Sequence, residues 1–324
     1  MAERKIELIV VAYEFLEPKH LEAIRAAAPG VELTVVSARE WEERRAELGP
    51  RVEVAIGMLP LPDLRALPKL RWLQQAGAGA DWLLRAPDIA QGPLIVTNAS
   101  GVHAIPIAEH ILALMFTLSR RIHRFVRAQQ SHEWFRRGRL GELEGSTLGI
   151  VGLGAIGAKT AEKARGLGMR VLGLRRNPAK TCPYVERMYG PDGLGELLAQ
   201  SDWVAIAAGL TPETERLIGE KELRQMKPSA YLINIARGSV IDEAVLVRAL
   251  QEEWIAGAGL DVFEREPLPS DSPLWDMRNV VITPHFAGMT PHYSDRVIEI
   301  FCDNLQRYQS GEPLRNVVDK QLAY

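Results

Sequence analysis

TLGIVGLGAIGAKTAEKARGL, residues 147–167, is the stretch of this sequence that decides the fold. An apolar run, TLGIV, comes first, the glycine-rich turn GLGAIG follows at 152–157, and a helix-forming run begins at residue 158. A strand, a glycine-rich turn and a helix in this order are typical of a βαβ unit that binds a dinucleotide. A further apolar run, RVLGL at 170–174, stands where the second parallel strand of such a unit belongs.

Each glycine of the turn, Gly152, Gly154 and Gly157, has a physical reason. In the pattern GxGxxG the first glycine permits the tight bend, the second lets the backbone approach a pyrophosphate, and the third lets the helix pack closely on the strand. The N-terminus of the following helix attracts the anion. We therefore expect a dinucleotide cofactor at this turn.

Two arginines end the second strand, where an acid is the commoner residue in such folds. A carboxylate there would accept hydrogen bonds from the 2′-hydroxyl of the adenosine ribose and would repel a 2′-phosphate. The guanidinium of Arg175 can instead bind that phosphate through two hydrogen bonds, with Arg176 as a second donor. The pair predicts NADP(H) as the preferred cofactor, with NAD(H) possible. The alternative is that both arginines are solvated on the surface and NAD(H) is preferred.

Further apolar runs on either side of this stretch alternate with helix-forming or turn-rich segments. Near-continuous apolar strands that alternate with helices indicate parallel sheets covered on both faces. We expect strands at 6–12, 31–36, 52–57, 70–75 and 93–98, and in a second series at 147–151, 170–174, 203–208, 230–235, 255–261 and 280–282. The fold class is therefore α/β, with two doubly wound parallel-sheet domains.

The segment between the two series is predicted to be one long helix that starts near Gly101. Its apolar residues follow a spacing of three and four from Ile105 to Val126, and further apolar residues occupy its other faces. A helix that is apolar nearly all round must be buried, so we expect it to pack between domains or against a second subunit. The tail from Pro291 contains another helical stretch, which we expect to return to the first domain.

Length and composition fit an ordinary globular protein. The 324 residues favour two domains, and 47% hydrophobic residues, 25% charged residues and a net charge of −2 do not suggest a nucleic-acid partner. The start MAERKIELIVVAYEF lacks the pattern of a signal peptide, and the apolar stretch 111–118 is far shorter than the roughly 20 residues that cross a bilayer. We expect a cytoplasmic protein that does not enter a membrane.

Cysteines and histidines indicate no metal site. Cys182 and Cys302 stand apart without a CxxC motif, which favours two reduced thiols. His103 and His110 lie seven apart on one predicted helix, but no HExxH motif or acid-rich loop accompanies them. We interpret both histidines as packing or interface residues.

Three later motifs lie at or just beyond predicted strands of the second series: NIARGSVIDE (234–243), GLDVFEREPLP (259–269) and ITPHFAG (282–288). Their candidate catalytic residues are Arg237, Glu266 and His285. Each of these alone is compatible with a structural role. In a parallel sheet, however, the ligand crevice lies outside the carboxyl ends of the strands, so all three should face the nicotinamide.

An arginine, a glutamate and a histidine together suit the reduction of a 2-keto acid. Arg237 can bind the substrate carboxylate and polarise the carbonyl, and His285 can donate the proton as hydride arrives. The ordinary pKa of a histidine is about 6.5. A neighbouring carboxylate, Glu266, would raise the pKa of His285 and stabilise the imidazolium.

With these motifs the sequence resembles the D-isomer-specific 2-hydroxyacid dehydrogenase family over essentially the whole chain, in its NADP-preferring, glyoxylate/hydroxypyruvate reductase-like branch. The family's motifs occur in order: QAGAGAD (75–81), IAEH (107–110), GLGAIG (152–157), SDWVAIAAGLTPETERLI (201–218), INIARGSVIDE (233–243), LDVFEREP (260–267) and TPHFAG (283–288). The resemblance implies a flavodoxin-like substrate-binding domain of residues 1–100 plus 289–324, an inserted Rossmann domain of residues 101–288, and an active site in the cleft between them.

The resemblance also assigns residues one by one. The three candidates above match the family's catalytic triad, with Arg237 and His285 also binding the substrate, and Ala78 and Gly79 match the loop whose backbone amides hold the substrate carboxylate. Asp261 matches the aspartate that approaches the nicotinamide carboxamide. Further cofactor contacts are implied at Ala155, Ile156, Thr211, Ile235, Ala236 and Gly288. A homodimer joined through the nucleotide-binding domains is implied as well.

The side chain of the substrate must be recognised elsewhere. GMLPLP at 57–62 follows a predicted strand, and Met58 or Leu59 could lie over the substrate's tail, which would favour apolar or compact tails. The sequence departs from the family at Ser100 and His103, where Pro and Asn are common, and this affects the hinge rather than the chemistry.

The leading hypothesis is an NADP(H)-dependent reductase that converts small 2-keto acids to D-2-hydroxy acids. Two alternatives stay open. Corepressors that share this fold sense nicotinamide nucleotides and could keep the triad, although the short termini here offer no regulatory arm. A phosphite dehydrogenase uses a similar triad, whereas Glu266 argues against a formate dehydrogenase.

Overall fold

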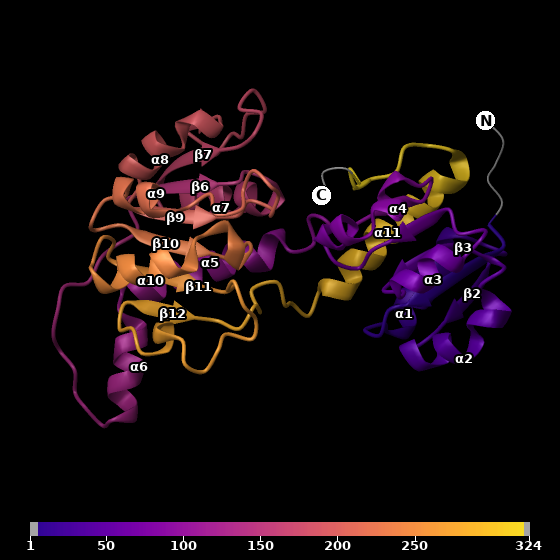
Figure 1. Ribbon diagram of the computed structural model, residues 1–324, viewed down its shortest axis with the longest axis horizontal. Coiled ribbons are helices and arrows are strands. Elements are labelled where there is room, and N and C mark those ends of the chain that lie inside the picture. Colours follow the sequence, from indigo (N-terminus) through magenta and orange to yellow (C-terminus); the bar gives the residue numbers. More distant parts are fainter. Residues whose placement is uncertain (1–5, 321–324) are drawn as a thin grey trace. The chain divides into compact units, whose positions relative to one another are not determined.

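Figure 1 shows the fold in a computed structural model, which describes residues 6–320. The chain divides into two compact units. The first unit is the chain up to Val102 together with the segment from Thr290 onward, and the second unit is His103–Met289. Residues 1–5, which entered the argument about a signal peptide, and residues 321–324 of the predicted substrate-binding domain lie outside the described residues.

Within the described part of the chain, the first unit is built on a five-stranded parallel sheet in the order β2-β1-β3-β4-β5. Its strands are β1 (Leu8–Ala12), β2 (Glu32–Val35), β3 (Val52–Gly57), β4 (Trp72–Gln74) and β5 (Ile95–Thr97). This is the strand order of flavodoxin-like folds. The central strands β1 and β3 are almost wholly apolar and buried, because both faces of the sheet are covered.

The last helix of the chain belongs to the first unit. The helices of this unit are α1 (Pro18–Ala27), α2 (Ala38–Leu48), α3 (Leu61–Ala66), α4 (Pro87–Gln91) and α11 (Tyr293–Ser310). Phe301 and Tyr308 of α11 pack on the indole of Trp72, with ring centroids 5.3 and 5.4 Å apart. The buried amide of Asn304 donates a hydrogen bond to Gln74 Oε1 at 3.3 Å. These contacts fix α11 to the sheet.

In residues 103–289 a seven-stranded parallel sheet has the order β12-β11-β10-β9-β6-β7-β8. Its strands are β6 (Thr147–Val151), β7 (Arg170–Leu174), β8 (Arg187–Tyr189), β9 (Trp203–Ile206), β10 (Tyr231–Asn234), β11 (Gly257–Leu260) and β12 (Val280–Ile282). Numbered along the chain from β6, the strands follow the Rossmann order 3-2-1-4-5-6 with one strand added. The order reverses between β6 and β9, where such sheets bind their ligands.

Helices cover both faces of this sheet: α5 (Ala104–Ser119), α7 (Ala155–Gly166), α8 (Leu194–Gln200), α9 (Glu220–Gln225) and α10 (Glu243–Gln251). Helix α6 (Ile122–Gln130) follows α5 and contacts it. Ile150 of β6 packs in one core with α5 and α7, and its neighbour Val151 packs in the other with α8, α9 and α10. Alternate residues of a strand thus serve opposite faces. The predicted α/β class with two doubly wound parallel sheets is confirmed.

The prediction of one long helix that starts near Gly101 is wrong, because the structure has two helices in this segment. Helix α5 ends at Ser119 and α6 begins at Ile122. Arg121 between them has a φ of 53°, a left-handed conformation that a continuous right-handed helix cannot include. The apolar spacing continues across the break, and no glycine or proline marks it.

Strand β8 was not expected from the sequence. It is an edge strand of three residues, RMY, that pairs only with β7 among the described residues. A segment this short with an exposed arginine has no apolar run to reveal it.

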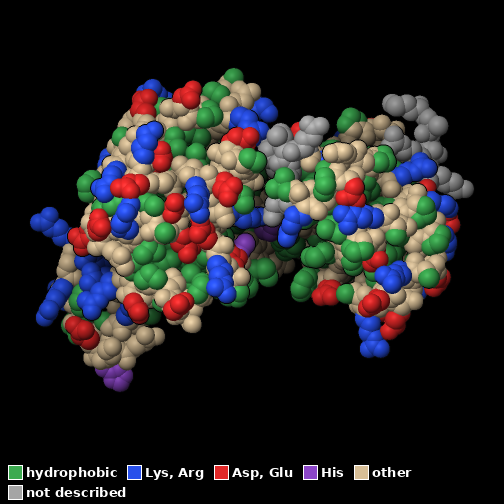
Figure 2. Space-filling model, in the orientation of Figure 1, with side chains coloured by type: hydrophobic (Ala, Val, Ile, Leu, Met, Phe, Trp, Pro, Cys, Tyr) green, Lys and Arg blue, Asp and Glu red, His purple; other side chains and the backbone are tan. Residues whose placement is uncertain are grey.

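On the face shown in Figure 2, acidic and basic side chains are intermingled on both units. No helix within residues 6–320 is both long and apolar enough to span a membrane.

Candidate active site

Three of the predicted site residues follow adjacent strands of the second unit. Arg237, Asp261 and His285 come after the carboxyl ends of β10, β11 and β12, which pair in parallel (Figure 1). The same edge carries the glycine turn after β6 and the arginines after β7. The topology therefore gathers cofactor-binding and catalytic candidates at one edge of one sheet.

The glycine turn between β6 and α7 is packed against the chain at two of its three glycines. Gly152 has a φ of 99°, and an added Cβ would lie 2.4 Å from a backbone nitrogen after β9. A Cβ on Gly157 would lie 2.4 Å from the carbonyl oxygen of Gly152, so only glycine lets α7 come this close. A Cβ on Gly154 would meet no heavy atom of the described residues within 4 Å. This open side, next to the start of α7 at Ala155 and Ile156, fits a pyrophosphate.

Arg175 and Arg176 follow β7 directly. Arg175 Nη1 donates a hydrogen bond to the carbonyl oxygen of Lys180 at 3.2 Å. Arg176 Nη2 lies 3.9 Å from Glu213 Oε2, and that oxygen accepts a hydrogen bond from Thr211 Oγ1 at 2.7 Å. Two predicted cofactor residues, Arg176 and Thr211, thus meet at a carboxylate that sequence reasoning missed, because Glu213 is distant from Arg176 along the chain. An anion bound at Arg176 would compete with the carboxylate of Glu213 for the guanidinium group.

His285 and Glu266 are in direct contact. His285 Nδ1 lies 2.7 Å from Glu266 Oε2. The other carboxylate oxygen of Glu266 accepts a hydrogen bond from the backbone N–H of Phe263 at 3.0 Å, which orients the carboxylate. Because Nδ1 faces Glu266, Nε2 is the ring nitrogen that can meet a substrate.

Asp261 holds the loop that carries His285. Its buried carboxylate accepts hydrogen bonds from Thr283 Oγ1 at 2.5 Å and from the backbone N–H groups of Phe286 and Ala287, each at 3.0 Å. Its carbonyl oxygen accepts the backbone N–H of His285 at 2.8 Å. The φ of His285 is 53°, an uncommon conformation that these bonds maintain. Sequence reasoning linked Asp261 to the cofactor alone and missed this role, because most of the donors are backbone groups.

Arg237 lies near His103, which the sequence predicts to be a packing or interface residue. Arg237 Nη1 donates to the carbonyl oxygen of Ala236 at 2.8 Å, and both Ile235 and Ala236 are buried. Burial lowers the pKa of His103, and the nearby Arg237 cation lowers it further. A Cβ on Gly288 would lie 2.8 Å from His103 Cδ2, so this ring packs on the predicted cofactor residue. His103 is therefore a neighbour of two predicted site residues, and its pKa lies below the ordinary value for a histidine.

The first unit carries the remaining candidates. Ala78 and Gly79 lie half-buried in the loop after β4. Leu59 as a substrate contact is wrong, because its side chain is buried in the core of this unit. Met58 is 88% exposed and keeps its predicted role as a hypothesis.

A Rossmann sheet whose glycine turn fits a pyrophosphate, with a histidine and a glutamate paired beyond the carboxyl ends of its strands, defines the class of nicotinamide-dependent oxidoreductases. Residues 112–287 match the family model described as "D-isomer specific 2-hydroxyacid dehydrogenase, NAD binding domain". The chain belongs to the D-isomer specific 2-hydroxyacid dehydrogenase family.

Relatives and solved structures agree with this membership. A glyoxylate reductase of Korarchaeum cryptofilum is 40% identical over 266 residues, which cover 80% of this chain and 79% of the relative. A D-isomer specific 2-hydroxyacid dehydrogenase of Xanthobacter autotrophicus, solved with NADPH and MES, is 32% identical with a TM-score of 0.83, covering 99% of this chain and 100% of that one. The NADPH-dependent glyoxylate/hydroxypyruvate reductase of Sinorhizobium meliloti, solved with NADP and sulfate, is 28% identical with a TM-score of 0.83, covering 98% and 100%.

Proposed function

We propose that this protein reduces glyoxylate and similarly small 2-keto acids to D-2-hydroxy acids, with NADPH as the preferred reductant. The observation that carries the proposal is the 2.7 Å contact between His285 and Glu266 beyond the end of β12. The name of the Korarchaeum relative supports glyoxylate as a substrate, and that of the Sinorhizobium enzyme supports hydroxypyruvate.

The proposed reaction assigns a role to each residue of the site. NADPH, when bound, supplies the hydride that reaches the carbonyl carbon. His285 donates a proton from Nε2 to the carbonyl oxygen, and Glu266, on the other ring nitrogen, stabilises the imidazolium and fixes the ring. Arg237 binds the substrate carboxylate, and the backbone amides of Ala78 and Gly79 are proposed to bind it as well.

The cofactor preference rests on the end of β7. Arg175 and Arg176 can donate charge-assisted hydrogen bonds to the 2′-phosphate that distinguishes NADPH from NADH. Gly152, Gly154 and Gly157 are proposed to hold the pyrophosphate, with Asp261 near the nicotinamide. NADPH bound to the Xanthobacter structure and NADP bound to the Sinorhizobium structure support this preference.

The experiment that tests the function measures initial rates of NADPH and NADH oxidation with glyoxylate, hydroxypyruvate, pyruvate, branched 2-keto acids and ketopantoate. We expect turnover with glyoxylate or hydroxypyruvate and a higher kcat/KM with NADPH. Tight NADPH binding without turnover of any acid would favour a nucleotide-sensing protein. Reduction of NADP⁺ by phosphite would favour the inorganic substrate.

His285→Gln tests the assigned proton donor. The amide cannot supply a proton, so kcat should fall by about 10²- to 10⁴-fold while the Kd for NADPH, measured by fluorescence titration, stays nearly unchanged. The same substitution at the exposed His132 serves as the matched control and should leave kcat unchanged. Unchanged turnover in H285Q would refute the role of His285.

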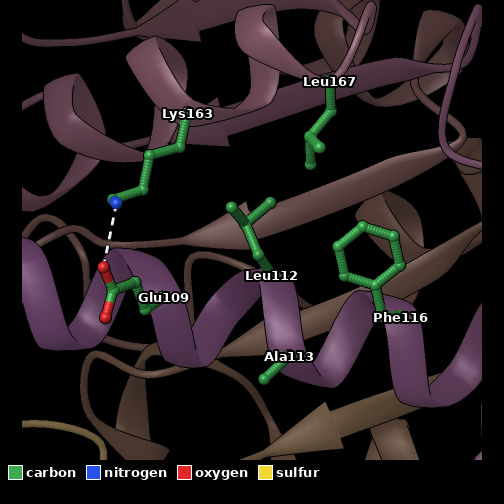
Figure 3. A pocket seen from close by; sticks show the side chains of 6 residues that line it. All are labelled: Glu109, Leu112, Ala113, Phe116, Lys163 and Leu167. Carbon is green, nitrogen blue, oxygen red and sulfur yellow. Dashed lines mark hydrogen bonds and ion pairs between the residues drawn. The ribbon is translucent and has the colours of Figure 1, made fainter.

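We further propose a homodimer joined through the second units. Helices α5 and α7 form an apolar groove of about 430 Å³ on this unit (Figure 3). Its apolar lining is Leu112, Ala113, Phe116 and Leu167. At one side Lys163 Nζ pairs with Glu109 Oε1 at 2.9 Å. An apolar face with charged residues at its rim is typical of a subunit interface.

The proposed location is the cytoplasm. Cys182 and Cys302 are free thiols, and reduced cysteines are typical of a reducing compartment.

A further inference from the structure

The carbonyl groups of the loop after β4 are held by hydrogen bonds from the rest of the first unit and from the loop itself. Four consecutive carbonyl oxygens each accept a hydrogen bond from within the first unit. The donors are Tyr293 Oη to Ala76 at 2.6 Å, the backbone N–H of Ala99 to Gly77 at 3.0 Å, Asn98 Nδ2 to Ala78 at 2.8 Å, and Gln75 Nε2 to Gly79.

Holding a carbonyl also fixes the amide that follows it. The peptide unit is planar and trans, so the N–H of each residue points opposite to the carbonyl of the residue before it. The N–H groups of Gly77, Ala78, Gly79 and Ala80 are therefore directed away from the donors that hold the loop. The N–H groups of Ala78 and Gly79 are thus held in one orientation by the hydrogen bonds to the carbonyls of Gly77 and Ala78.

Both side-chain amides among these donors, those of Gln75 and Asn98, are themselves fixed in orientation. The indole Nε1 of Trp82 donates to Gln75 Oε1 at 2.7 Å, and the backbone N–H of Ser100 donates to Asn98 Oδ1 at 3.0 Å. Because each amide oxygen already accepts a hydrogen bond, each amide nitrogen must be the atom that faces the loop. Gln75 and Asn98 can thus act only as donors to the loop.

Tyr293 brings the third side chain from α11. Burial raises the pKa of its phenol to about 12, with a smaller contribution from Tyr13. The hydroxyl therefore stays protonated and donates to Ala76 throughout the working pH range. Through this bond the first turn of α11 fixes the loop that the proposed function uses.

We propose that Tyr293, Asn98 and Gln75 are positioning residues for the substrate carboxylate, which hold the amides of Ala78 and Gly79 in the orientation that receives it. This inference rests on the proposed function, because it takes the carboxylate of a 2-keto acid as the bound anion. None of the three side chains takes part in proton or hydride transfer.

Tyr293→Phe removes one hydroxyl and tests the inference. A less rigid loop binds the carboxylate more weakly before and during the reaction, so KM for glyoxylate should rise about tenfold with kcat within about twofold of the parent. The Kd of the unreactive dicarboxylate oxalate, measured calorimetrically with NADPH present, should rise by a similar factor. The Kd for NADPH should not change.

Tyr13→Phe is the matched control. Tyr13 Oη lies near Tyr293 and bonds to Ser294 Oγ at 3.0 Å, but it is not one of the four donors that hold the loop carbonyls, so removing this neighbouring hydroxyl should leave KM and the oxalate Kd unchanged. Unchanged KM and oxalate affinity in Y293F, or an equal rise in Y13F, would overturn the positioning role while the proposed function stands. A parent enzyme that neither turns over 2-keto acids nor binds oxalate would overturn the proposed function and the inference with it.

Discussion

Arg175 offers the sharpest test of cofactor choice at the level of a single residue. Its guanidinium is held at the end of β7 by the carbonyl of Lys180, whereas Arg176 pairs with Glu213. Arg175 can therefore bind a 2′-phosphate without first breaking an ion pair with a carboxylate, whereas Arg176 cannot. Arg175→Ala should weaken NADPH binding about tenfold or more, since a charge-assisted hydrogen bond contributes about 1.5 to 3 kcal/mol. NADH, which lacks that phosphate, should bind as before.

Fluorescence titration with both nucleotides measures this difference. Arg170→Ala is the control, because Arg170 lies at the opposite end of β7 and pairs with Glu186 at 2.8 Å. An equal loss of NADPH and NADH affinity in R175A would mean that Arg175 supports the fold of the turn rather than the phosphate.

At the level of elements, two glycines of the turn between β6 and α7 have different roles. Gly154 is predicted to affect cofactor binding, and Gly157 is predicted to affect packing. Gly154 has a φ of −85°, which alanine adopts, and its Cβ would meet no described atom within 4 Å. Gly154→Ala should therefore change the free energy of unfolding by less than about 1 kcal/mol but weaken NADPH binding, because the methyl group stands where the pyrophosphate approaches. Gly157→Ala should instead destabilise the protein by about 1 to 3 kcal/mol, because its Cβ would lie 2.4 Å from Gly152 O.

Urea unfolding and NADPH titration on the two variants check this contrast. If G154A lost as much stability as G157A, the open side of Gly154 would not be a ligand position.

The elements that the sequence predicted well are those with near-continuous apolar runs. VEVAIG and TLGIV coincide with β3 and β6, because a central parallel strand must be apolar toward both faces. Strand β8 and the break at Arg121 were missed because neither is set by local apolar pattern. At the candidate site, residue types placed after strands could be predicted. Contacts such as Tyr293 to Ala76 could not, because they depend on the tertiary fold.

At the level of the whole molecule, the proposed dimer rests on the exposed side of α5. Ile111 and Met115 of this helix are fully buried, but its Phe116 is 39% exposed. The second unit therefore does not bury this helix all round. The sequence predicts packing between domains or against a second subunit, and the proposed dimer is the second of these possibilities. Further exposed apolar side chains follow along the same segment: Ile122, Phe125, Val126 and Trp134.

Phe116→Asp tests this interface. A carboxylate in the groove would be desolvated by a second subunit without a partner, at a cost of several kcal/mol per ion and twice in a symmetric dimer. Light scattering after gel filtration should give twice 36.0 kDa for the parent and 36.0 kDa for F116D, with unchanged far-UV circular dichroism. Leu84→Asp is the control, because Leu84 is an exposed leucine of the first unit, and it should stay dimeric. A dimeric F116D would place the interface elsewhere, and a monomeric parent would refute the dimer itself.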